Sequence, residues 1–388
     1  MKNAYMRRLT YISVLIISMM GCRKPYSPPA ITGKGSYLVV EGVINSGTDS
    51  TVIKLSRTVN VSSKVTANPV TGAALAVESD QNAIYPLTET ANGNYVSAGL
   101  NLDISRQYRL SIKTSDNKQY LSDLVPVNVT PPIDSIGYNI VTTADTGIQI
   151  YVNTHDANNN TRYYRWDYDE AWAFHAKYAS NFISDGSAIF ARTRAQYMFF
   201  CFTNDVSGVI VLGSSAKLQQ NVIYQNPIIF IPSASEKLES KYSILLREYA
   251  LTADAYSFWV NLKKNTEQLG SIFDAQPSQI KGNIHSTTNP QEPVIGYISA
   301  CTVSSKRIFI SNSQLPNWVP TYPYQCNLDT TGKGSGIYIH DLIVNPQTFF
   351  IIDGIPSAFN PSRYTFTESN ACVDCTIRGT KTQPAFWR

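Results

Sequence analysis

Cys22 is the residue whose chemistry the sequence defines best. It follows Gly21 and an apolar run over residues 9–20, and three basic residues precede that run. A basic segment followed by a short apolar run is typical of a secretory signal, and a small residue directly before a cysteine is where bacterial lipoproteins are cleaved and acylated. The run is shorter than the roughly 20 residues of a membrane-spanning helix. The sequence therefore predicts a lipoprotein signal peptide over residues 1–21 and lipidation of Cys22.

Five other cysteines remain, and disulfides are expected among them, because this is the usual state of cysteines in an exported protein. They are Cys201, Cys301, Cys326, Cys372 and Cys375. The segment Cys372-Val-Asp-Cys375 also fits half of a zinc site or a redox motif. However, a structural zinc site needs a second close pair, and a redox motif needs a βαβ context. We predict that Cys326 pairs with one of the two C-terminal cysteines and Cys201 with the other, which leaves Cys301 free.

No other combination of residues indicates a catalytic centre. The four histidines are too scattered to form a ligand pair by spacing, and His155 and His340 each precede an aspartate, as polar turn residues do. The segment from Asp156 to Asn160 lacks the glycine of a calcium loop and predicts an Asn-rich hairpin turn. The sequence contains neither a nucleophile elbow nor a phosphate-binding loop. We therefore predict no catalytic residue, no metal site and no cofactor.

The charge balance argues against nucleic-acid binding. The chain has 32 basic and 28 acidic residues, and the signal peptide contains three of the basic residues and none of the acidic ones. The mature protein is therefore almost neutral, whereas a nucleic-acid-binding domain carries a clustered basic excess. Charged residues make up 15% of the chain and tyrosines number 24, which is typical of exported β-proteins. The same composition suits carbohydrate binding, so that alternative stays open.

The first third of the mature chain predicts a tether and a β domain. Three prolines within residues 22–36 favour an extended spacer. Seven short strand patterns separated by turn residues follow, which predicts an immunoglobulin-like β-sandwich over residues 37–130. A proline cluster marks a boundary near residue 130. The seven strands are predicted at residues 37–44, 51–57, 73–78, 83–87, 93–97, 107–113 and 118–124.

Residues 131–388 are predicted to form a larger β-rich domain with one substantial helix. Thr252 is a good N-cap for a helix that reaches about residue 269, before Gly270. Apolar residues at spacings of three and four give this helix one face that can pack on a sheet. The predicted fold class is therefore mainly β. Strands are predicted at residues 148–153, 162–172, 197–203, 209–212, 228–231, 241–249, 294–303 and 307–310.

Ordered segments along the whole mature chain carry a family resemblance. They begin with Cys22-Arg-Lys-Pro-Tyr and Tyr37-Leu-Val-Val-Glu-Gly-Val-Ile, and they end with Cys372-Val-Asp-Cys-Thr and Pro384-Ala-Phe-Trp. Together they resemble a Bacteroidetes lipoprotein family that is described only as a domain of unknown function, number 4249. The other segments lie at residues 55–58, 93–95, 108–112, 131–136, 268–279, 282–284, 296–297 and 306–310.

The resemblance implies an outer-membrane-associated lipoprotein, often encoded beside a TonB-dependent transporter, and it defines no catalytic residue. Bacteroidetes lipoproteins displayed on the cell surface tend to carry acidic residues after the lipidated cysteine, whereas Arg23 and Lys24 follow Cys22 here. The face of the outer membrane therefore stays open. We expect an accessory protein, held to the outer membrane by its lipid anchor, that binds such a transporter; its small-molecule ligand is unknown. A hydrolase of surface polymers is one alternative, because paired catalytic acids can come from distant strands. A purely structural envelope protein is the other.

Overall fold

Strands make up most of the regular structure of the computed structural model, which describes residues 36–59, 68–143, 145–267, 281–355 and 361–387. The chain divides into two units, residues 1–36 and Tyr37–Arg388. The predicted signal peptide, Cys22 and the tether up to residue 35 lie outside the described residues. The fold is mainly β with one substantial helix, as the sequence predicts. In the described part of the chain, no helix is long and apolar enough to cross a membrane.

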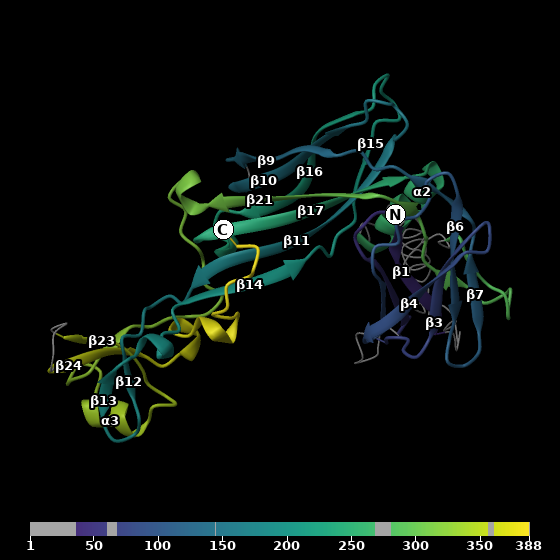
Figure 1. Ribbon diagram of the computed structural model, residues 1–388. Helices are drawn as coiled ribbons and strands as arrows, with labels where there is room; N and C mark the ends of the chain where they lie inside the picture. Colours follow the sequence, from purple (N-terminus) through teal and green to yellow (C-terminus); the bar gives the residue numbers. More distant parts are fainter. Residues whose placement is uncertain (1–35, 60–67, 144, 268–280, 356–360, 388) are drawn as a thin grey trace, which may run out of the picture. The chain divides into compact units, whose positions relative to one another are not determined.

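The N-terminal strands form a ring that hydrogen bonds close on itself (Figure 1). The order around the ring is β6-β3-β4-β5-β2-β1-β20-β8, and β8 pairs with β6. The seven predicted strands are all present, but they are joined in one barrel-like sheet, not in the two separate sheets of the expected sandwich. The bounds are β1 Leu38–Asn45, β2 Thr51–Arg57, β3 Ala74–Ser79, β4 Ile84–Ala91, β5 Asn94–Ser97, β6 Gln107–Lys113, β7 Gln119–Ser122, β8 Val125–Asn128 and β20 Ala300–Cys301.

Alternation along the strands fills the interior of this barrel. In β2, Thr51, Ile53 and Leu55 are buried, whereas Val52 and Lys54 are exposed. Successive side chains of a strand point to opposite faces, so a period of two places one set inside. Strands β3 and β6 show the same alternation. Burial of the apolar set against the opposite wall provides the driving force for closure.

A late segment of the chain completes the barrel. Strand β20 lies parallel to both β1 and β8 and connects them. Ile44 N donates to Ser299 O at 2.9 Å, and Ser46 N donates to Cys301 O at 3.0 Å. Two further short strands, β18 (Ile284–Ser286) and β19 (Val294–Ile295), pair with β7 and β1. These late strands therefore belong to the barrel, although every strand of the central sheets except β21 precedes them in the sequence.

Two central sheets enclose a second core, and in Figure 1 β11, β17 and β21 lie side by side. One sheet has the order β16-β10-β9, and the other has the order β14-β11-β17-β21 with β15 beside β11. Trp166, Phe174 and Ile150 are among the buried residues between them. The bounds are β9 Ile133–Val141, β10 Gly147–His155, β11 Tyr163–His175, β14 Phe200–Val206, β15 Val211–Ser214, β16 Val222–Pro232, β17 Lys241–Leu251 and β21 Val303–Ser311.

Strand β11 separates aromatic from charged side chains. Tyr164, Trp166 and Tyr168 are buried in the core, whereas the intervening Arg165 and Asp167 are only partly buried. Because the side-chain period is two, all the intervening residues share the opposite, outer face of the sheet. This face carries the candidate site.

The segment between β10 and β11 forms the predicted Asn-rich turn, but it is not a hairpin turn, because β10 and β11 belong to different sheets and do not pair with each other. The Asp156 carboxylate accepts backbone hydrogen bonds from Asn158, Asn160 and Thr161 at 2.8–2.9 Å. Burial acts to raise the pKa of Asp156, but these bonds outweigh it and the pKa is lowered. The carboxylate is therefore the acceptor that closes the turn.

Helix α2 (Ala253–Glu267) follows β17 and begins after the predicted cap. The Thr252 hydroxyl accepts a hydrogen bond from Ala255 N at 3.2 Å, which satisfies one free N–H of the first turn. Ala255 and Phe258 are buried, and the helix packs beside β11, β15 and β17. The last two residues of the predicted helix, 268 and 269, lie outside the described residues.

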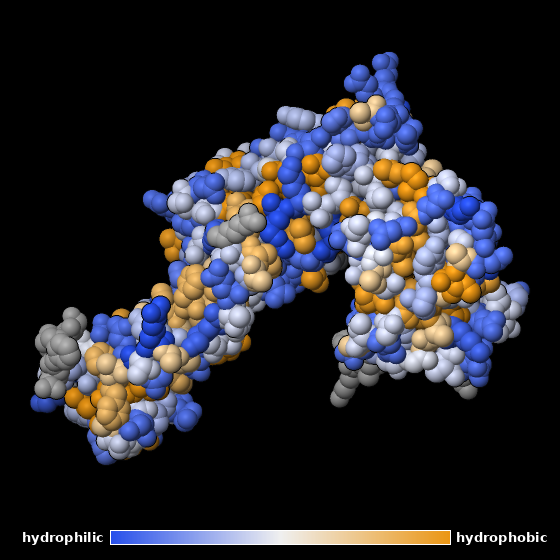
Figure 2. All heavy atoms as spheres, in the orientation of Figure 1, coloured by the Kyte–Doolittle hydropathy of each residue, from blue (hydrophilic) through white to orange (hydrophobic). Residues whose placement is uncertain are grey.

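The C-terminal part contains short elements around a small core of Leu342, Ile351, Tyr364 and Phe366. Its surface, like that of the barrel and central sheets, shows hydrophobic and hydrophilic residues interspersed on the visible face (Figure 2). The bounds here are β12 Phe182–Ser184, β13 Ile189–Ala191, β22 Asp329–Thr330, α3 Ile339–Val344, β23 Phe350–Ile355 and β24 Arg363–Thr367. The 3-10 helices are η1 Arg194–Gln196, η2 Glu236–Leu238, η3 Asn312–Gln314, η4 Asn370–Cys372 and η5 Cys375–Ile377.

Candidate functional site

The outer face of the sheet that contains β11 and β17 carries a cluster of opposite charges. Arg247 Nε donates to Asp167 Oδ1 at 2.6 Å, and the two terminal nitrogens of Arg247 donate to the two oxygens of Asp169 at 2.7 Å each. Asp167 and Arg247 are direct cross-strand partners, so the register of β11 and β17 brings them together. The hydrogen bonds with Asp169 are the main cause of the raised pKa of Arg247. The guanidinium is thus a permanent counter-ion for both carboxylates.

Arg165 extends this cluster toward the barrel. Its guanidinium carbon lies 4.6 Å from the ring centre of Tyr249 and 4.4 Å from that of Trp259, so cation–π contacts with both rings hold it in place. Its ion pair with Asp167 is longer, at 3.5 Å. Among the described residues, the buried Nε of Arg165 has no hydrogen-bond partner. Arg165 is therefore a firmly positioned but weakly paired cation.

A cleft of about 600 Å³ opens beside Arg165, between the sheet and the β1–β2 hairpin of the barrel. The two walls are joined because Ala250 N donates to Thr130 Oγ1 at 3.0 Å, and because Val43 and Tyr249 pack in one apolar cluster. The volume is in the usual range for small-molecule sites. The sheet contributes Arg165, Asp167, Leu245, Arg247, Tyr249, Val303 and Ser305, and the barrel contributes Gly42, Val43, Asn45, Asp49, Ser50 and Val52.

Asp49 is the acidic residue on the barrel wall of this cleft. It lies in the turn between β1 and β2 and is exposed. Within the described parts of the chain, its carboxylate has neither an ion pair nor a hydrogen-bond partner. The cleft therefore has a weakly paired cation on one wall and an unpaired anion on the other.

The C-terminal residues cover another part of the same outer face. Thr380 and Phe202 of β14 exchange two backbone hydrogen bonds of 2.8 Å. Trp387 contacts Phe202 edge-on, with ring centroids 5.3 Å apart, and Arg307 stacks on Phe386 at 3.7 Å. A smaller cleft of about 290 Å³ lies between this tail and the sheet.

Two carboxylates of the same strands point into the core instead. Glu248 accepts a hydrogen bond from Trp166 Nε1 at 2.8 Å. Glu170 accepts from Tyr242 Oη and Lys237 Nζ, both at 2.6 Å. Glu248 is fully buried and Glu170 nearly so. These carboxylates stabilise the packing of the sheets and are out of reach of a substrate.

His175 and Glu239 form a partly buried pair near the end of β11. His175 Nδ1 lies 2.9 Å from Glu239 Oε1, and the Tyr322 hydroxyl donates to the same oxygen at 2.7 Å. Burial raises the pKa of Glu239, but these hydrogen bonds and one from the His175 backbone lower it overall. The pair lines neither of the two clefts described above, so its geometry indicates a structural contact.

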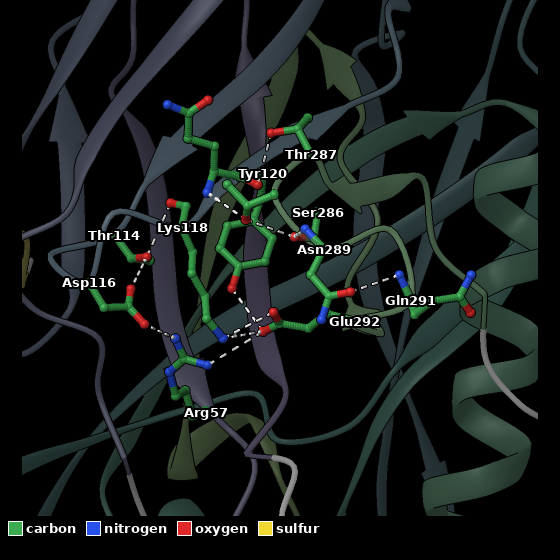
Figure 3. Close-up of polar contacts among 12 residues, drawn as sticks. Arg57, Thr114, Asp116, Lys118, Tyr120, Ser286, Thr287, Asn289, Gln291 and Glu292 are labelled. Atoms are coloured by element: carbon green, nitrogen blue, oxygen red, sulfur yellow. Dashed lines mark hydrogen bonds and ion pairs between the residues drawn. The ribbon is translucent and has the colours of Figure 1, made fainter.

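Figure 3 shows a second polar cluster, at the barrel, where Glu292 of the β18–β19 connection contacts Arg57 of β2, Tyr120 of β7 and Lys118, which directly precedes β7. Lys118 Nζ donates to Glu292 Oε2 at 3.0 Å, and the Tyr120 hydroxyl donates to Oε1 at 2.9 Å. The Arg57 guanidinium lies 3.9 Å from Oε1. Burial, followed by the hydrogen bond with Glu292, raises the pKa of Tyr120 to about 12, so the phenol stays a donor at neutral pH. The cluster attaches the segment that completes the barrel, and a cleft of about 310 Å³ lies against it.

The comparison with known families places the chain in a family. The family model described as "Domain of unknown function (DUF4249)" matches residues 23–307. The chain belongs to this family. The family region contains the whole barrel, most of the central sheets and every residue that lines the 600 Å³ cleft. Cys326, Cys372, Cys375 and the tail over β14 lie beyond the matched residues, whereas Cys201 lies within them. A search of curated proteins found no match to the chain.

Two disulfides join the four cysteines that the sequence analysis names. Cys201 is bonded to Cys375, and Cys326 is bonded to Cys372. Cys301 is free and buried, and burial raises the pKa of its thiol to about 12. The sequence left open which C-terminal cysteine each partner takes, and only the fold decides between them.

The remaining sequence-predicted residues are dispersed. Cys22 lies outside the described residues. His155 is the last residue of β10, where it lies 2.8 Å from Asp134 Oδ2, and His340 lies in helix α3. The sequence analysis expected both histidines in turns, and neither lies in one. In the described part of the chain, no group of three histidine, cysteine, aspartate or glutamate residues could hold a metal ion.

Sequence reasoning missed the charged face of β11. The sequence contained a sign of this face, because the charged residues Arg165, Asp167 and Asp169 occupy every second position of a predicted strand. The partner strand that carries Arg247 was also predicted. Their pairing was not, because it depends on the register of strands far apart in the chain.

Proposed function

We propose that the chain is a lipid-anchored accessory protein of the outer membrane that binds a TonB-dependent transporter and carries out no chemistry of its own. The signal sequence, Cys22 and the Pro-rich segment after it support an anchor and a spacer. The near-neutral mature chain disfavours a nucleic-acid partner. The observation that carries the non-enzymatic part is the binding of both Asp167 and Asp169 by Arg247.

A carboxylate-dependent hydrolase needs one acid that donates a proton and a second that acts as base or nucleophile. Three of the four oxygens of Asp167 and Asp169 accept hydrogen bonds from one guanidinium. Both carboxylates therefore already have a charged partner within the protein. Glu170 and Glu248 are enclosed by the core. The face presents fixed charges and a cleft, which suits binding.

The proposal is tested by purifying the tagged native lipoprotein from cells in mild detergent after brief chemical cross-linking. We expect an outer-membrane transporter to co-purify and to remain after washing. The Cys22→Ala variant is the matched control, because it should lose lipid labelling, leave the membrane fraction and recover less transporter. Protease treatment of intact cells then distinguishes a surface-exposed protein from one that faces the periplasm.

The rival hydrolase makes an opposite prediction. Recovery of the wild-type protein without any transporter, together with turnover of an isolated surface polymer, would overturn the proposal. In that case the Asp167→Asn and Asp169→Asn variants should abolish turnover, whereas the accessory role predicts that no turnover exists to be lost.

A further inference from the structure

A weakly paired cation and an unpaired anion line the two walls of the 600 Å³ cleft. On the sheet wall, Arg165 shares Asp167 with Arg247, and Asp167 is closer to Arg247, at 2.6 Å against 3.5 Å. On the barrel wall, Asp49 has no partner in the described residues. A ligand with an anionic group at Arg165 and a cationic group at Asp49 would give both side chains a charged partner.

The surroundings of Arg165 make it a strong anion site. The rings of Tyr249 and Trp259 both contact its guanidinium group. Little side-chain conformational entropy is therefore lost when Arg165 binds an anion. Only 15% of its side chain is exposed, and charges in such low-dielectric surroundings interact more strongly than in bulk water. A guanidinium matches the two oxygens of a carboxylate.

Two other charged residues line the cleft, Asp167 and Arg247, and of these Asp167 forms the 3.5 Å ion pair with Arg165 that a ligand carboxylate would have to share. Arg247 is held by Asp167 and Asp169 and remains engaged. Ser50 and Ser305 add hydroxyl groups at the walls, and Val52 adds apolar surface. These groups suit the backbone and small side chains of a peptide.

We propose that this cleft binds a small zwitterion of the amino acid or short peptide class, with its carboxylate on Arg165 and its ammonium group on Asp49. The inference names the ligand of the proposed accessory protein and rests on its role as a binding protein. Its test uses the purified protein without any transporter, so a failure to bind peptide and a failure to bind the transporter are separate results.

Three probes isolate the two charges: trialanine, its C-terminal amide and N-acetyl-trialanine. Calorimetry at low ionic strength should show binding of trialanine that weakens as salt is added. Removal of either charge from the probe should weaken binding about tenfold or more. No binding of any probe up to about 10 mM, or equal binding of all three, would overturn the inference.

Variants assign each charge to its residue. Asp49→Asn should weaken trialanine binding about tenfold and leave N-acetyl-trialanine unchanged. Arg165→Lys keeps the positive charge but loses the planar guanidinium that matches a carboxylate. This variant should weaken the binding of trialanine and leave the binding of its C-terminal amide unchanged. If either variant weakens all probes equally, the assignment is wrong.

Controls separate binding from folding. Arg109 pairs with Glu78 at 2.8 Å on the barrel, and Arg109→Ala should leave all three affinities unchanged. Asp49 is exposed, so its variant should retain the melting temperature of the wild type. Ser50→Trp should block the cleft from an exposed position and abolish trialanine binding; unchanged binding in this variant would place the ligand elsewhere and refute the site.

Discussion

Trp166 and Glu248 stand directly opposite each other on β11 and β17, and the indole Nε1 donates a 2.8 Å hydrogen bond to Glu248 Oε2. The other carboxyl oxygen of Glu248 accepts a hydrogen bond from Thr154 Oγ1 of β10 at 2.9 Å. One buried carboxyl group thus connects the two central sheets. Burial raises its pKa to about 7, although both hydrogen bonds act to lower it.

This pKa makes stability depend on pH. The folded state binds more protons at Glu248 than the unfolded state between the usual value of 4.5 and about 7. The free energy of unfolding therefore falls as pH rises through that window. Glu248→Gln keeps an acceptor for Trp166 and removes the titration. Relative to wild type, the variant should gain up to about 3 kcal/mol between pH 5 and pH 8 in urea unfolding.

The exposed Glu368→Gln is the control for this experiment, and its unfolding free energy should follow that of the wild type across the same range. A parallel pH dependence of wild type and Glu248→Gln would show that Glu248 does not titrate in this window.

The disulfides should stabilise the protein by restricting the unfolded chain. They close separations of 174 residues for Cys201–Cys375 and 46 residues for Cys326–Cys372. The chain-entropy model gives about 4 kcal/mol or somewhat more for each. Double replacement by alanine should lower the free energy of unfolding by amounts of this order.

Reductant provides the check on that result. Dithiothreitol should destabilise the wild type and Cys301→Ala, which retain both bonds, but should affect each double variant less. Equal sensitivity of all these proteins to the reductant would contradict the pairing.

Closure of the barrel should depend on Gly296. Its φ is +147°, and a Cβ at this position would lie 2.3 Å from Val40 O of β1. An alanine side chain must therefore displace the backbone of a neighbouring strand. We expect Gly296→Ala to cost about 2 kcal/mol or more in denaturant unfolding. Gly208→Ala is the control, because a Cβ at Gly208 would have no atom within 4 Å among the described residues; equal losses in the two variants would contradict a close approach at Gly296.

Glu292 should stabilise the late segment of the barrel through its contacts with Lys118 and Tyr120. Its side chain is 10% exposed, so Glu292→Gln leaves partly buried donors without their charged acceptor. We expect a loss of about 1–3 kcal/mol and faster hydrogen exchange in β18 and β19. The exposed pair of Glu41 and Lys54, at 3.6 Å, is the comparison, and Glu41→Gln should cost less than about 1 kcal/mol. Unchanged exchange in β18 and β19 would argue against the attachment.

Local patterns in the sequence determined much of the secondary structure. Residues 51–57 and 107–113 were predicted as strands and form β2 and β6 with these same bounds. The cap at Thr252 and the turn at Asp156 were also predicted. Each depends on interactions within a few residues, such as alternation, capping or an Asx turn. Strand β9 was missed because Pro131 and Pro132 marked a boundary where a strand begins only one residue later.

Only the tertiary structure decided how these elements combine. The ring is completed by the two-residue strand β20, which lies inside the predicted strand 294–303. Its pairing with β1, more than 250 residues earlier in the chain, could not be predicted from local pattern. The cleft likewise brings Asp49 and Arg165 to its two walls, and the choice of Cys372 by Cys326 follows from the packing of the C-terminal part. Such contacts are selected by the burial of whole faces and by strand register, which are properties of the assembled chain. A short stretch of sequence contains only one of the two residues that form each of these contacts.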